Sequence, residues 1–576
     1  MDQGHLVRFT LLKSFVIATS LLVTSVPASA QGLAGNYLAG RAAASSYDYE
    51  AASLYYTRLL VANPSDPFLL ESLVLANLSL GNMDKAIPIA RRLDAIDDVS
   101  SQLANMALIA DLSARGRFDE VMTRIQAEEG IGPLVDGLIL AWAALGDGDM
   151  NATVAGFDAV AQEPGLAGFA LYHKALAMAS VGDFAGAEDI YSSEGALGMQ
   201  LTRRGAMAQI EILSQLDRND DGLEILDALF GKDLDPQLRQ VRADLADGKR
   251  LPFTHVRSAS EGIAEVFYSL ADALRGEADP DYALLYTRTA EFLRPDHVDA
   301  LLLSAELLED LEQYELATQA YRSVPADHIS FHAAELGRAE ALRHSGRIDA
   351  AIEVLEQLAR THGDLPIVHN TLGDVFRQQQ DYARAAQAYD KALSMMTDPS
   401  DGKWFTLYAR GITNERLGDW PAAEADFRAA LELNPDQPQV LNYLGYSLVE
   451  KRIKLDEALG MIERAVEARP DSGYIVDSLG WVLYRLGRFD EAVDPMERAA
   501  ALMPVDPIVN DHLGDVYWKV GRKTEARFQW HRALSFIDED SAPEADPDRI
   551  RQKLDVGLDA VLEAEGNDPV QVANDG

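Results

Sequence analysis

Small and bulky apolar residues recur along most of the chain with a period of about 34 residues, most clearly near the C-terminal end. Gly445, Gly480 and Gly514 each follow a leucine and lie 35 and 34 residues apart. The apolar stretch after each glycine carries a small residue and, four positions later, a bulky one, as in Ala492 and Met496. Because spacings of three and four place residues on one helix face, the pattern predicts two amphipathic helices per repeat.

The repeated glycine lies inside the first predicted helix, where glycine is about 1 kcal/mol less favourable than alanine. Its recurrence indicates that the two helices approach each other closely at this point. A second glycine, such as Gly487, marks the turn between the helices, and a proline, such as Pro504, ends the second helix. The same pattern, though weaker, covers almost the whole chain after residue 30 and gives about 14 repeats.

This spacing of glycine, alanine and proline resembles the tetratricopeptide repeat, and Val476 to Pro504 matches the family pattern almost throughout. The resemblance implies an all-α, right-handed superhelical solenoid in which each helix pair packs on its neighbours. We expect a degenerate array over residues 31–250 and a regular array over residues 251–540. The stretch 232–260 lacks a clean repeat, so we expect it to break or bend the array.

The N-terminal end has the order of a secretory signal peptide. Arg8 and Lys13 precede an apolar run of about a dozen residues, Phe15 to Val26, and Ala28-Ser29-Ala30 offers small residues for cleavage. The run is too short for an ordinary transmembrane helix, although an uncleaved membrane anchor is the alternative interpretation. We therefore expect residues 1–30 to be a signal peptide and the protein to be exported to the periplasm of a Gram-negative bacterium.

The C-terminal end, residues 541–576, departs from the repeat pattern. An acidic loop containing prolines follows Leu534, and residues 548–563 are predicted to form one helix. A terminal helix with a polar outer face caps a repeat array, since the last repeat has no neighbour to cover it. We expect the last dozen residues to be disordered.

Composition narrows the classes of partner and chemistry. The chain has 51 Lys and Arg residues against 92 Asp and Glu residues, a net charge of −41, which repels the phosphates of nucleic acids. It has no cysteine, which excludes disulfides, thiolate zinc sites, a cysteine nucleophile and a bacterial lipoprotein anchor. No phosphate-binding loop or serine nucleophile elbow is present, so we expect neither an enzyme nor a cofactor.

Two short motifs suggest metal binding, but neither satisfies the chemistry of a metal site. Residues Asp217 to Gly222 begin like a calcium loop, yet Ala228 stands where the loop needs a bidentate glutamate. We expect them to form an inter-helix turn. His328 and His332 lie four residues apart, but His328 follows a proline in a predicted loop. We therefore predict no metal site.

The family resemblance implies that first helices line a concave groove, and the regular repeats place aromatic, polar and charged residues there. Trp481 and Trp518 lie outside the positions that pack within a repeat, so we expect partial exposure and partner contact. The alternative is that they pack against the neighbouring repeat or the cap. Asp477 and Asp511 argue against capture of an anionic terminus. The predicted groove residues are Tyr408, Ile412, Glu415, Arg416, Asn442, Tyr446, Glu450, Tyr474, Asp477, Trp481, Tyr484, Arg485, Asp511, Asp515, Trp518 and Lys519.

The run from Leu441 to Leu534 also resembles the C-terminal repeats of proteobacterial envelope repeat proteins. Some of these deliver cell-wall hydrolases to a carboxyl-terminal processing protease. The resemblance implies an envelope adaptor that binds a protein or peptide partner, with a processing protease or cell-wall hydrolase as the candidate. The alternative is a structural component of polysaccharide export or outer-membrane assembly machinery.

Overall fold

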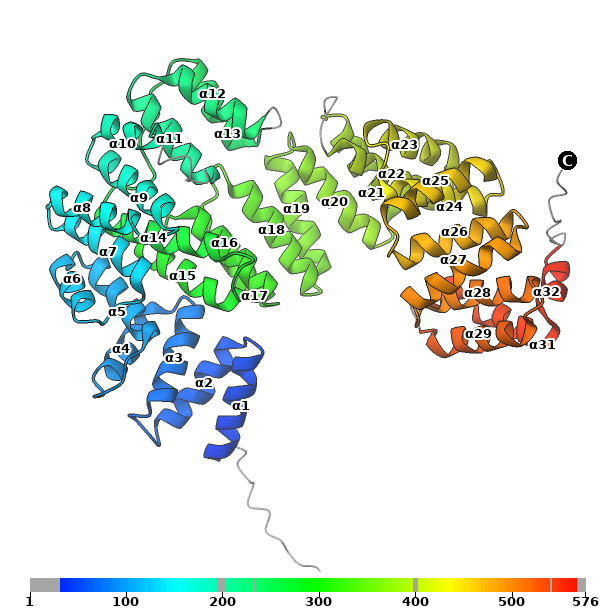
Figure 1. The fold of residues 1–576 in the computed structure, drawn as a ribbon, viewed down its shortest axis with the longest axis horizontal. Helices are drawn as coiled ribbons and strands as arrows, with labels where there is room; N and C mark the ends of the chain where they lie inside the picture. The colour runs from blue at the N-terminus through cyan, green and yellow to red at the C-terminus, as the bar shows by residue number, and fades with distance from the viewer. Residues whose placement is uncertain (1–31, 194–201, 232–233, 397–401, 539–540, 567–576) are drawn as a thin grey trace, which may run out of the picture. The chain divides into compact units, whose positions relative to one another are not determined.

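The computed structural model describes residues 32–193, 202–231, 234–396, 402–538 and 541–566. Over these residues the chain consists of α-helices without a β-strand, and successive helices stack in pairs (Figure 1). The predicted all-α solenoid is therefore confirmed. The chain divides into two compact units, Met1–Gly337 and Arg338–Gly576, which we call the N-terminal unit and the C-terminal unit.

The N-terminal unit begins with six consecutive helix pairs. The pairs are α1 (Leu33–Ser45) with α2 (Tyr49–Leu60), α3 (Pro67–Ser79) with α4 (Met83–Asp94), α5 (Gln102–Ala114) with α6 (Phe118–Gln126), α7 (Pro133–Gly146) with α8 (Met150–Ala161), α9 (Ala167–Ser180) with α10 (Phe184–Tyr191), and α11 (Arg203–Gln215) with α12 (Asn219–Phe230). An unpaired helix, α13 (Pro236–Ala246), follows. The unit continues with α14 (Ala259–Leu274), α15 (Pro280–Leu293), α16 (Val298–Asp310) and α17 (Tyr314–Arg322).

The C-terminal unit continues the pairs in a regular series, and α18 (Phe331–His344) crosses the boundary between the units. The following helices are α19 (Ile348–Thr361), α20 (Pro366–Gln378), α21 (Tyr382–Leu393), α22 (Lys403–Arg416), α23 (Trp420–Leu433), α24 (Pro438–Glu450), α25 (Leu455–Ala468), α26 (Gly473–Arg485), α27 (Phe489–Leu502), α28 (Pro507–Lys519) and α29 (Lys523–Phe536). Counted two by two, α1 to α12 and α14 to α29 give fourteen pairs among the described residues, as the sequence predicts.

The repeated glycines lie where the two helices of a pair touch. A Cβ atom added to Gly480 would lie 2.6 Å from Met496, and one added to Gly514 would lie 2.4 Å from Trp530. Contacts this short require the neighbour to move, so the helix crossing depends on glycine. The prediction of close helix approach is confirmed.

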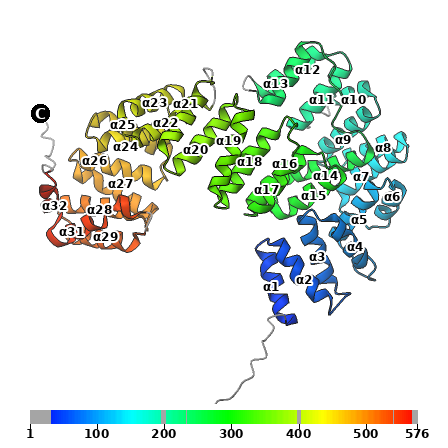
Figure 2. The same cartoon turned by 180° about the vertical axis from the view of Figure 1, so that it is seen from behind.

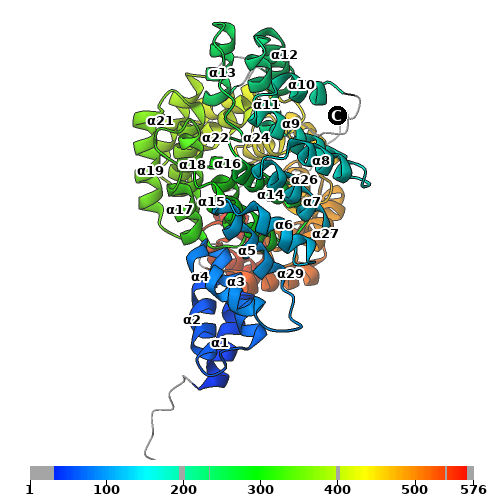
Figure 3. The same ribbon diagram turned by 90° about the vertical axis from the view of Figure 1, so that its left-hand side faces the viewer.

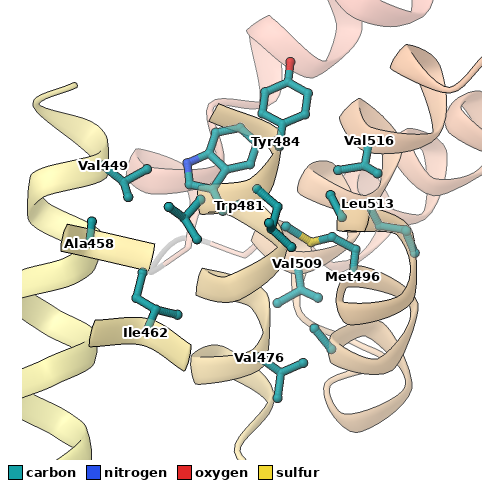
Figure 4. Packing of buried hydrophobic residues seen from close by; sticks show 14 of the residues in the cluster. Val449, Ala458, Ile462, Val476, Trp481, Tyr484, Met496, Val509, Leu513 and Val516 are labelled. Carbon is teal, nitrogen blue, oxygen red and sulfur yellow. The ribbon is translucent and has the colours of Figure 1, made fainter. Parts of the chain in front are cut away.

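The bulky residue of each second helix fills the core. Phe427, Ile462, Met496 and Trp530 have no exposed surface and belong to one continuous apolar cluster along the C-terminal unit. Figure 4 shows part of this cluster, where Ile462, Val476, Met496 and Leu513 come from four successive helices. Because each repeat covers the apolar face of the next, the unit is held together by contacts between sequence neighbours.

The N-terminal unit departs from this simple order after α13. Helix α14 packs against α7, α9 and α5, and α15 packs against α3 and α5 (Figures 2 and 3). The chain turns back through a non-helical stretch, residues 249–258, that follows α13. The predicted break over residues 232–260 is therefore observed at the described residues, and its consequence is that later helices cover earlier ones. Residues 232–233 lie outside the described part.

The C-terminal cap is formed by α31 (Pro547–Val556) and α32 (Leu558–Ala564), after the short α30 (Ala542–Ala545). The prediction of one helix over residues 548–563 is wrong, because Gly557 separates two helices with a backbone φ of +88°. Only glycine adopts this conformation easily. The cap itself is present, since Ile550, Leu554 and Leu558 join the core of the preceding repeats.

Three predictions concern residues or divisions that the structure does not test. The signal peptide over residues 1–30 lies outside the described residues, as do residues 567–576 at the other end. The predicted change from degenerate to regular repeats at residue 250 stays a prediction. The two compact units divide elsewhere, between Gly337 and Arg338. No helix among the described residues is long and apolar enough to span a membrane.

Candidate partner-binding groove

A hollow of about 770 Å³ lies on the face that the first helices α22, α24, α26 and α28 form in the C-terminal unit. We call it the C-terminal hollow. Its lining residues are Glu415, Arg416, Asn442, Tyr443, Tyr446, Ser447, Glu450, Tyr474, Asp477, Ser478, Trp481, Met503, Asp506, Ile508, Val509 and His512. Because these positions recur at the same place in consecutive repeats, stacking the repeats brings residues far apart in sequence around one space.

The structure brings half of the sixteen predicted groove residues together in this hollow. They are Glu415, Arg416, Asn442, Tyr446, Glu450, Tyr474, Asp477 and Trp481. The hollow is also lined from a neighbouring helix position that was not predicted, two residues before the repeat glycine, which contributes Tyr443 and His512. That position could have been found from the helix period. Met503 and Asp506 lie in or next to the turn before α28, and helix register does not predict their place.

Trp481 forms the floor of the C-terminal hollow and is only 9% exposed. Its ring stacks between Tyr484, at 4.8 Å between centroids, and His512, at 3.9 Å. Its indole Nε1 donates a hydrogen bond of 2.7 Å to Oε1 of Glu450. The expectation of partial exposure is therefore wrong for Trp481, because the ring packs against the next repeat; Figure 4 shows it beside Tyr484.

Asp477 and His512 form a buried pair beside this ring. Nδ1 of His512 lies 3.0 Å from Oδ2 of Asp477. Burial by itself lowers the pKa of the imidazole, but the carboxylates of Asp477, Asp511 and Asp515 together outweigh burial, so the net pKa of His512 is raised. The pair holds the His512 ring against Trp481 in the wall of the C-terminal hollow.

The rim of the C-terminal hollow is more accessible than its floor. Tyr474 is 52% exposed and the Glu450 side chain 45%. The Arg485 guanidinium lies 3.4 Å from Oε1 of Glu450, and burial lowers its pKa. Tyr484, also predicted as a groove residue, is buried in the stack with Trp481. An aromatic ring, a carboxylate and the exposed Arg416 guanidinium are therefore accessible at this hollow.

Tyr408 lies outside the C-terminal hollow. Its ring packs 6.1 Å from Phe427 and 5.9 Å from Tyr443, measured between centroids. Burial raises the pKa of the Tyr408 hydroxyl to about 12. Ile412 packs against the same core. These two predicted residues thus support the lining helices rather than the space between them.

The cap engages four predicted groove residues on α28. Lys553 of α31 is fully buried, and its Nζ lies 2.7 Å from Oδ2 of Asp511 and 2.7 Å from Oδ1 of Asp515. Asp559 of α32 accepts hydrogen bonds from the half-buried Trp518 and from Lys519. The alternative interpretation, packing against the cap, therefore describes Trp518.

The corresponding face of the N-terminal unit is covered by α14 and α15. Gly262 of α14 lies so close to Trp142 of α7 that an added Cβ would stand 2.3 Å from the indole. Nε2 of His173 on α9 lies 3.1 Å from Oγ of Ser269 on α14. On α15, Nε of Arg288 donates a hydrogen bond of 3.2 Å to the carbonyl oxygen of Ser79 at the end of α3.

A buried ion pair lies at the centre of this contact. Glu265 of α14 has no exposed surface and binds Arg204 of α11, with Nε 2.8 Å from Oε1. Glu265 also accepts a hydrogen bond of 2.8 Å from the Tyr172 hydroxyl, and Nε2 of His297 lies 3.2 Å from Oε2 of Glu265. Burial raises the pKa of Glu265, but Arg204 and His297 outweigh burial and hold the pKa well below its usual range.

An extended segment covers the same face near α11. Glu211 accepts hydrogen bonds from the backbone nitrogen and hydroxyl of Thr254, at 2.7 and 2.8 Å. The Ser214 hydroxyl accepts a hydrogen bond of 2.8 Å from the backbone nitrogen of Leu251. The first-helix face of the N-terminal unit is thus covered from α3 to α11 by later parts of the same chain.

The two metal-like motifs have structural roles. Asp217 lies in the turn between α11 and α12, with a positive φ of 61°, and pairs with Arg250, so the expected turn is confirmed. Nδ1 of His328 accepts a hydrogen bond from the backbone nitrogen of Ser330. Among the described residues, no cluster of three or more His, Asp or Glu side chains is arranged to hold a metal ion.

Family comparison agrees with the helix pairs and their glycine crossings. The tetratricopeptide-repeat family model matches residues 37–100, 336–401, 408–473, 454–507 and 478–542. The helix pairs in these segments are tetratricopeptide repeats. Proteins of this family present stacked helices to other proteins, and the chain is accordingly a protein–protein interaction scaffold.

The repeats are similar to those of several known proteins. A TPR repeat-containing protein of Pseudomonas aeruginosa is 28% identical over 159 residues, which is 27% of this chain and 26% of that protein. Human protein O-mannosyl-transferase TMTC1 is 25% identical over 223 residues, 38% of this chain and 24% of that protein. The chain thus spans about a quarter of each relative. The APC/C hetero-tetramer Cut9–Hcn1 gives a TM-score of 0.38 at 14% identity, covering 91% and 96% of the two chains.

Proposed function

We propose that this tetratricopeptide-repeat protein is a non-catalytic adaptor of the bacterial cell envelope that binds a partner protein in the C-terminal hollow. The observation that supports this site is the contrast between the two first-helix faces. In the N-terminal unit that face is covered by α14 and α15, whereas in the C-terminal unit it leaves a hollow of about 770 Å³. Aromatic residues and a carboxylate reach its rim, and such residues contribute strongly to binding at protein interfaces.

The envelope location and the class of partner are part of the proposal. The basic start, short apolar run and Ala28-Ser29-Ala30 site support export to the periplasm. The resemblance of the C-terminal repeats to envelope adaptors supports a processing protease or a cell-wall hydrolase as the partner. The matched Pseudomonas aeruginosa protein is bacterial, which agrees with this setting.

The test is a pulldown from an envelope fraction with the full chain and two variants. Tyr474→Ala removes an exposed ring from the rim, and Phe528→Ala removes a comparably exposed ring, 65% exposed, from α29 outside the C-terminal hollow. We expect a protease or hydrolase to be recovered by the wild type and by Phe528→Ala, and to be lost with Tyr474→Ala. Equal recovery with all three proteins would contradict the proposed site. Recovery of export or assembly machinery instead would contradict the proposed partner class.

A further inference from the structure

Exposed apolar side chains are concentrated at the start of the described chain. Among the described residues 18 large apolar side chains are exposed, and six of them come from the first three helices and their connections. The six are Leu33, Tyr37, Leu38, Leu54, Val61 and Phe68. Because these helices are a small part of the array, such a concentration is typical of an interaction surface.

Helix α1 comes first in the array among the described residues, and it lies at the outer end of the N-terminal unit (Figure 1). Later first helices pack on the second helix before them, as α3 does on α2 and α28 on α27. Helix α1 packs on α2 through Gly40, where an added Cβ would lie 2.8 Å from Tyr56. The opposite side of α1 is exposed, and we call it the outer face; its residues are Ala34, Leu38, Ala42 and Ser45.

The central position of the outer face is buried in later repeats. Leu38 is 67% exposed and lies nine residues before Tyr47, the turn residue with a positive φ. The matching residues, nine before the turn glycine of three later repeats, are Ala409, Ser478 and His512. All three are buried, and His512 packs on Trp481 of the preceding repeat. Leu38 therefore lies where a preceding repeat would cover it.

The first helix pair also lacks the negative charge of the rest of the chain. Residues 33–60 contain two arginines, Arg41 and Arg58, and two carboxylates, Asp48 and Glu50, so their charges cancel. The whole chain carries a net charge of −41. Two copies of such an acidic protein repel each other over most of their surface, and the repulsion is weakest where the local charge is balanced. The outer face is therefore a place where two copies meet without this repulsion.

The other end of the array limits how copies associate. The cap places Ile550, Leu554 and Leu558 on the core of the last repeat, so it already occupies the surface on which a second α1 would stack. Head-to-tail growth of the array through these two ends is thereby blocked. Contact between two outer faces instead uses the same surface on both copies, and such an isologous contact closes at a dimer.

We propose that two copies of this protein form a two-fold dimer through their outer faces, each α1 covering the other as a preceding repeat would. The dimer does not depend on partner binding in the C-terminal hollow. Standard protein interfaces use about 20–30 residues on each side. Helix α1 has 13 residues and buries one side against α2, so we expect a weak dimer with a dissociation constant in the micromolar range.

Sedimentation equilibrium measures the association of the full chain and of the chain beginning at Gln31, the form expected after cleavage. Concentrations of about 1 to 100 µM bracket the expected dissociation constant. The test variant, Leu38→Glu, places a charge in the middle of the outer face. The control, Phe528→Glu, places the same charge on α29 at a comparably exposed apolar position, 65% against 67%. Because both positions are exposed, circular dichroism should show unchanged helix content and melting temperature in both variants.

We expect a monomer–dimer equilibrium for both chain lengths, unchanged in Phe528→Glu, and a dissociation constant at least tenfold higher in Leu38→Glu. Monomers of both chain lengths at the highest concentration would overturn the inference, as would a dimer that Leu38→Glu leaves intact. A dimer in only one of the two chain lengths would assign either the contact or the covering of the outer face to residues 1–30, and would also overturn it.

A mixing experiment tests the two-fold symmetry of the contact. Trace amounts of fluorescently labelled Leu38→Glu are titrated with unlabelled wild type, and labelled wild type is titrated in parallel. Because a two-fold contact uses the outer face of both copies, the labelled variant should associate more weakly than labelled wild type. Equal association of the two labelled proteins would mean that the outer face meets a different surface of the second copy, which contradicts the two-fold dimer.

Discussion

The two units are built from the same helix pairs but use their first helices differently. In the N-terminal unit, α14 and α15 pack onto α3, α5, α7 and α9, and a buried salt bridge between Arg204 and Glu265 joins the two layers. In the C-terminal unit, the first helices leave the C-terminal hollow, and among the described residues the cap covers the last repeat. A repeat array can therefore cover its own first-helix face with later helices of the same chain, and the covered face then serves as structure rather than as a binding surface.

The largest effect is expected from breaking the ion pair that closes the N-terminal unit. Arg204→Met leaves Glu265 buried without its charge partner, which lowers the free energy of unfolding by about 3–5 kcal/mol. Peptide-resolved hydrogen exchange should show faster exchange in α9, α11 and α14 and no change in α22 to α29. Arg203→Met is the control, because Arg203 is 44% exposed and pairs with the half-buried Asp235. Similar destabilisation by both variants would argue against a central role for this pair.

A buried ion pair also holds the cap of the C-terminal unit, and it can be broken in the same way. Lys553→Met leaves Asp511 and Asp515 buried without a cation and should lower the free energy of unfolding of the cap region by about 3 kcal/mol. Urea unfolding followed by tryptophan fluorescence measures this, because Trp518 and Trp530 lie beside the cap. Arg551→Met, on the same helix but 61% exposed, should change little. Wild-type stability in Lys553→Met would mean that the cap is held by apolar contacts alone.

The two units should also respond to pH with opposite sign at their buried histidines. Burial lowers the pKa of His173 to about 4. As the pH falls, the imidazole is therefore protonated in the unfolded chain before it is protonated in the folded chain. The N-terminal unit keeps this stability above pH 6.5 and loses about 2 kcal/mol of it between pH 6.5 and 5. His512 has a raised pKa, so its contribution to the C-terminal unit is full below pH 6.5 and is lost as the pH rises through the raised value.

Hydrogen exchange at pH 7 and pH 5, corrected for intrinsic rates, separates the two contributions. His173→Gln should remove much of the acid sensitivity of α7, α9 and α14. The groups that act on His512 are Asp477, Asp511 and Asp515, and Asp477→Asn should remove most of the contribution of His512. The same sign in both units would contradict the assignment of these protonation states.

The smallest effect on stability is expected at the rim of the C-terminal hollow. Tyr474→Ala should change the free energy of unfolding by less than about 0.5 kcal/mol, because the ring is 52% exposed. Partner affinity should fall at least tenfold, since exposed aromatic residues dominate such interfaces. Thermal unfolding and isothermal titration on the same sample measure both quantities. A large loss of stability would mean that the ring is structural.

Much of the fold follows from the sequence, because the same helix-helix contact recurs in each repeat and leaves the same residue pattern each time. Gly480 and Met496 predict a helix crossing, and the structure places them in contact. The fold-back of α14 onto α7 was not predictable, because its contacts, such as that of Gly262 with Trp142, are made once rather than at a repeated position. For the same reason the engagement of Asp511 by Lys553 was missed. Repeat register locates a groove face, but it does not say which parts of the chain cover it.

We propose that the C-terminal hollow binds the partner and that the covered face of the N-terminal unit does not. Hydrogen exchange of the full chain with and without the partner recovered by pulldown tests it most directly. We expect slower exchange on binding in α22, α24, α26 and the start of α28, with α3, α5, α7 and α9 unchanged. Slower exchange confined to α3, α5, α7 and α9 would contradict it.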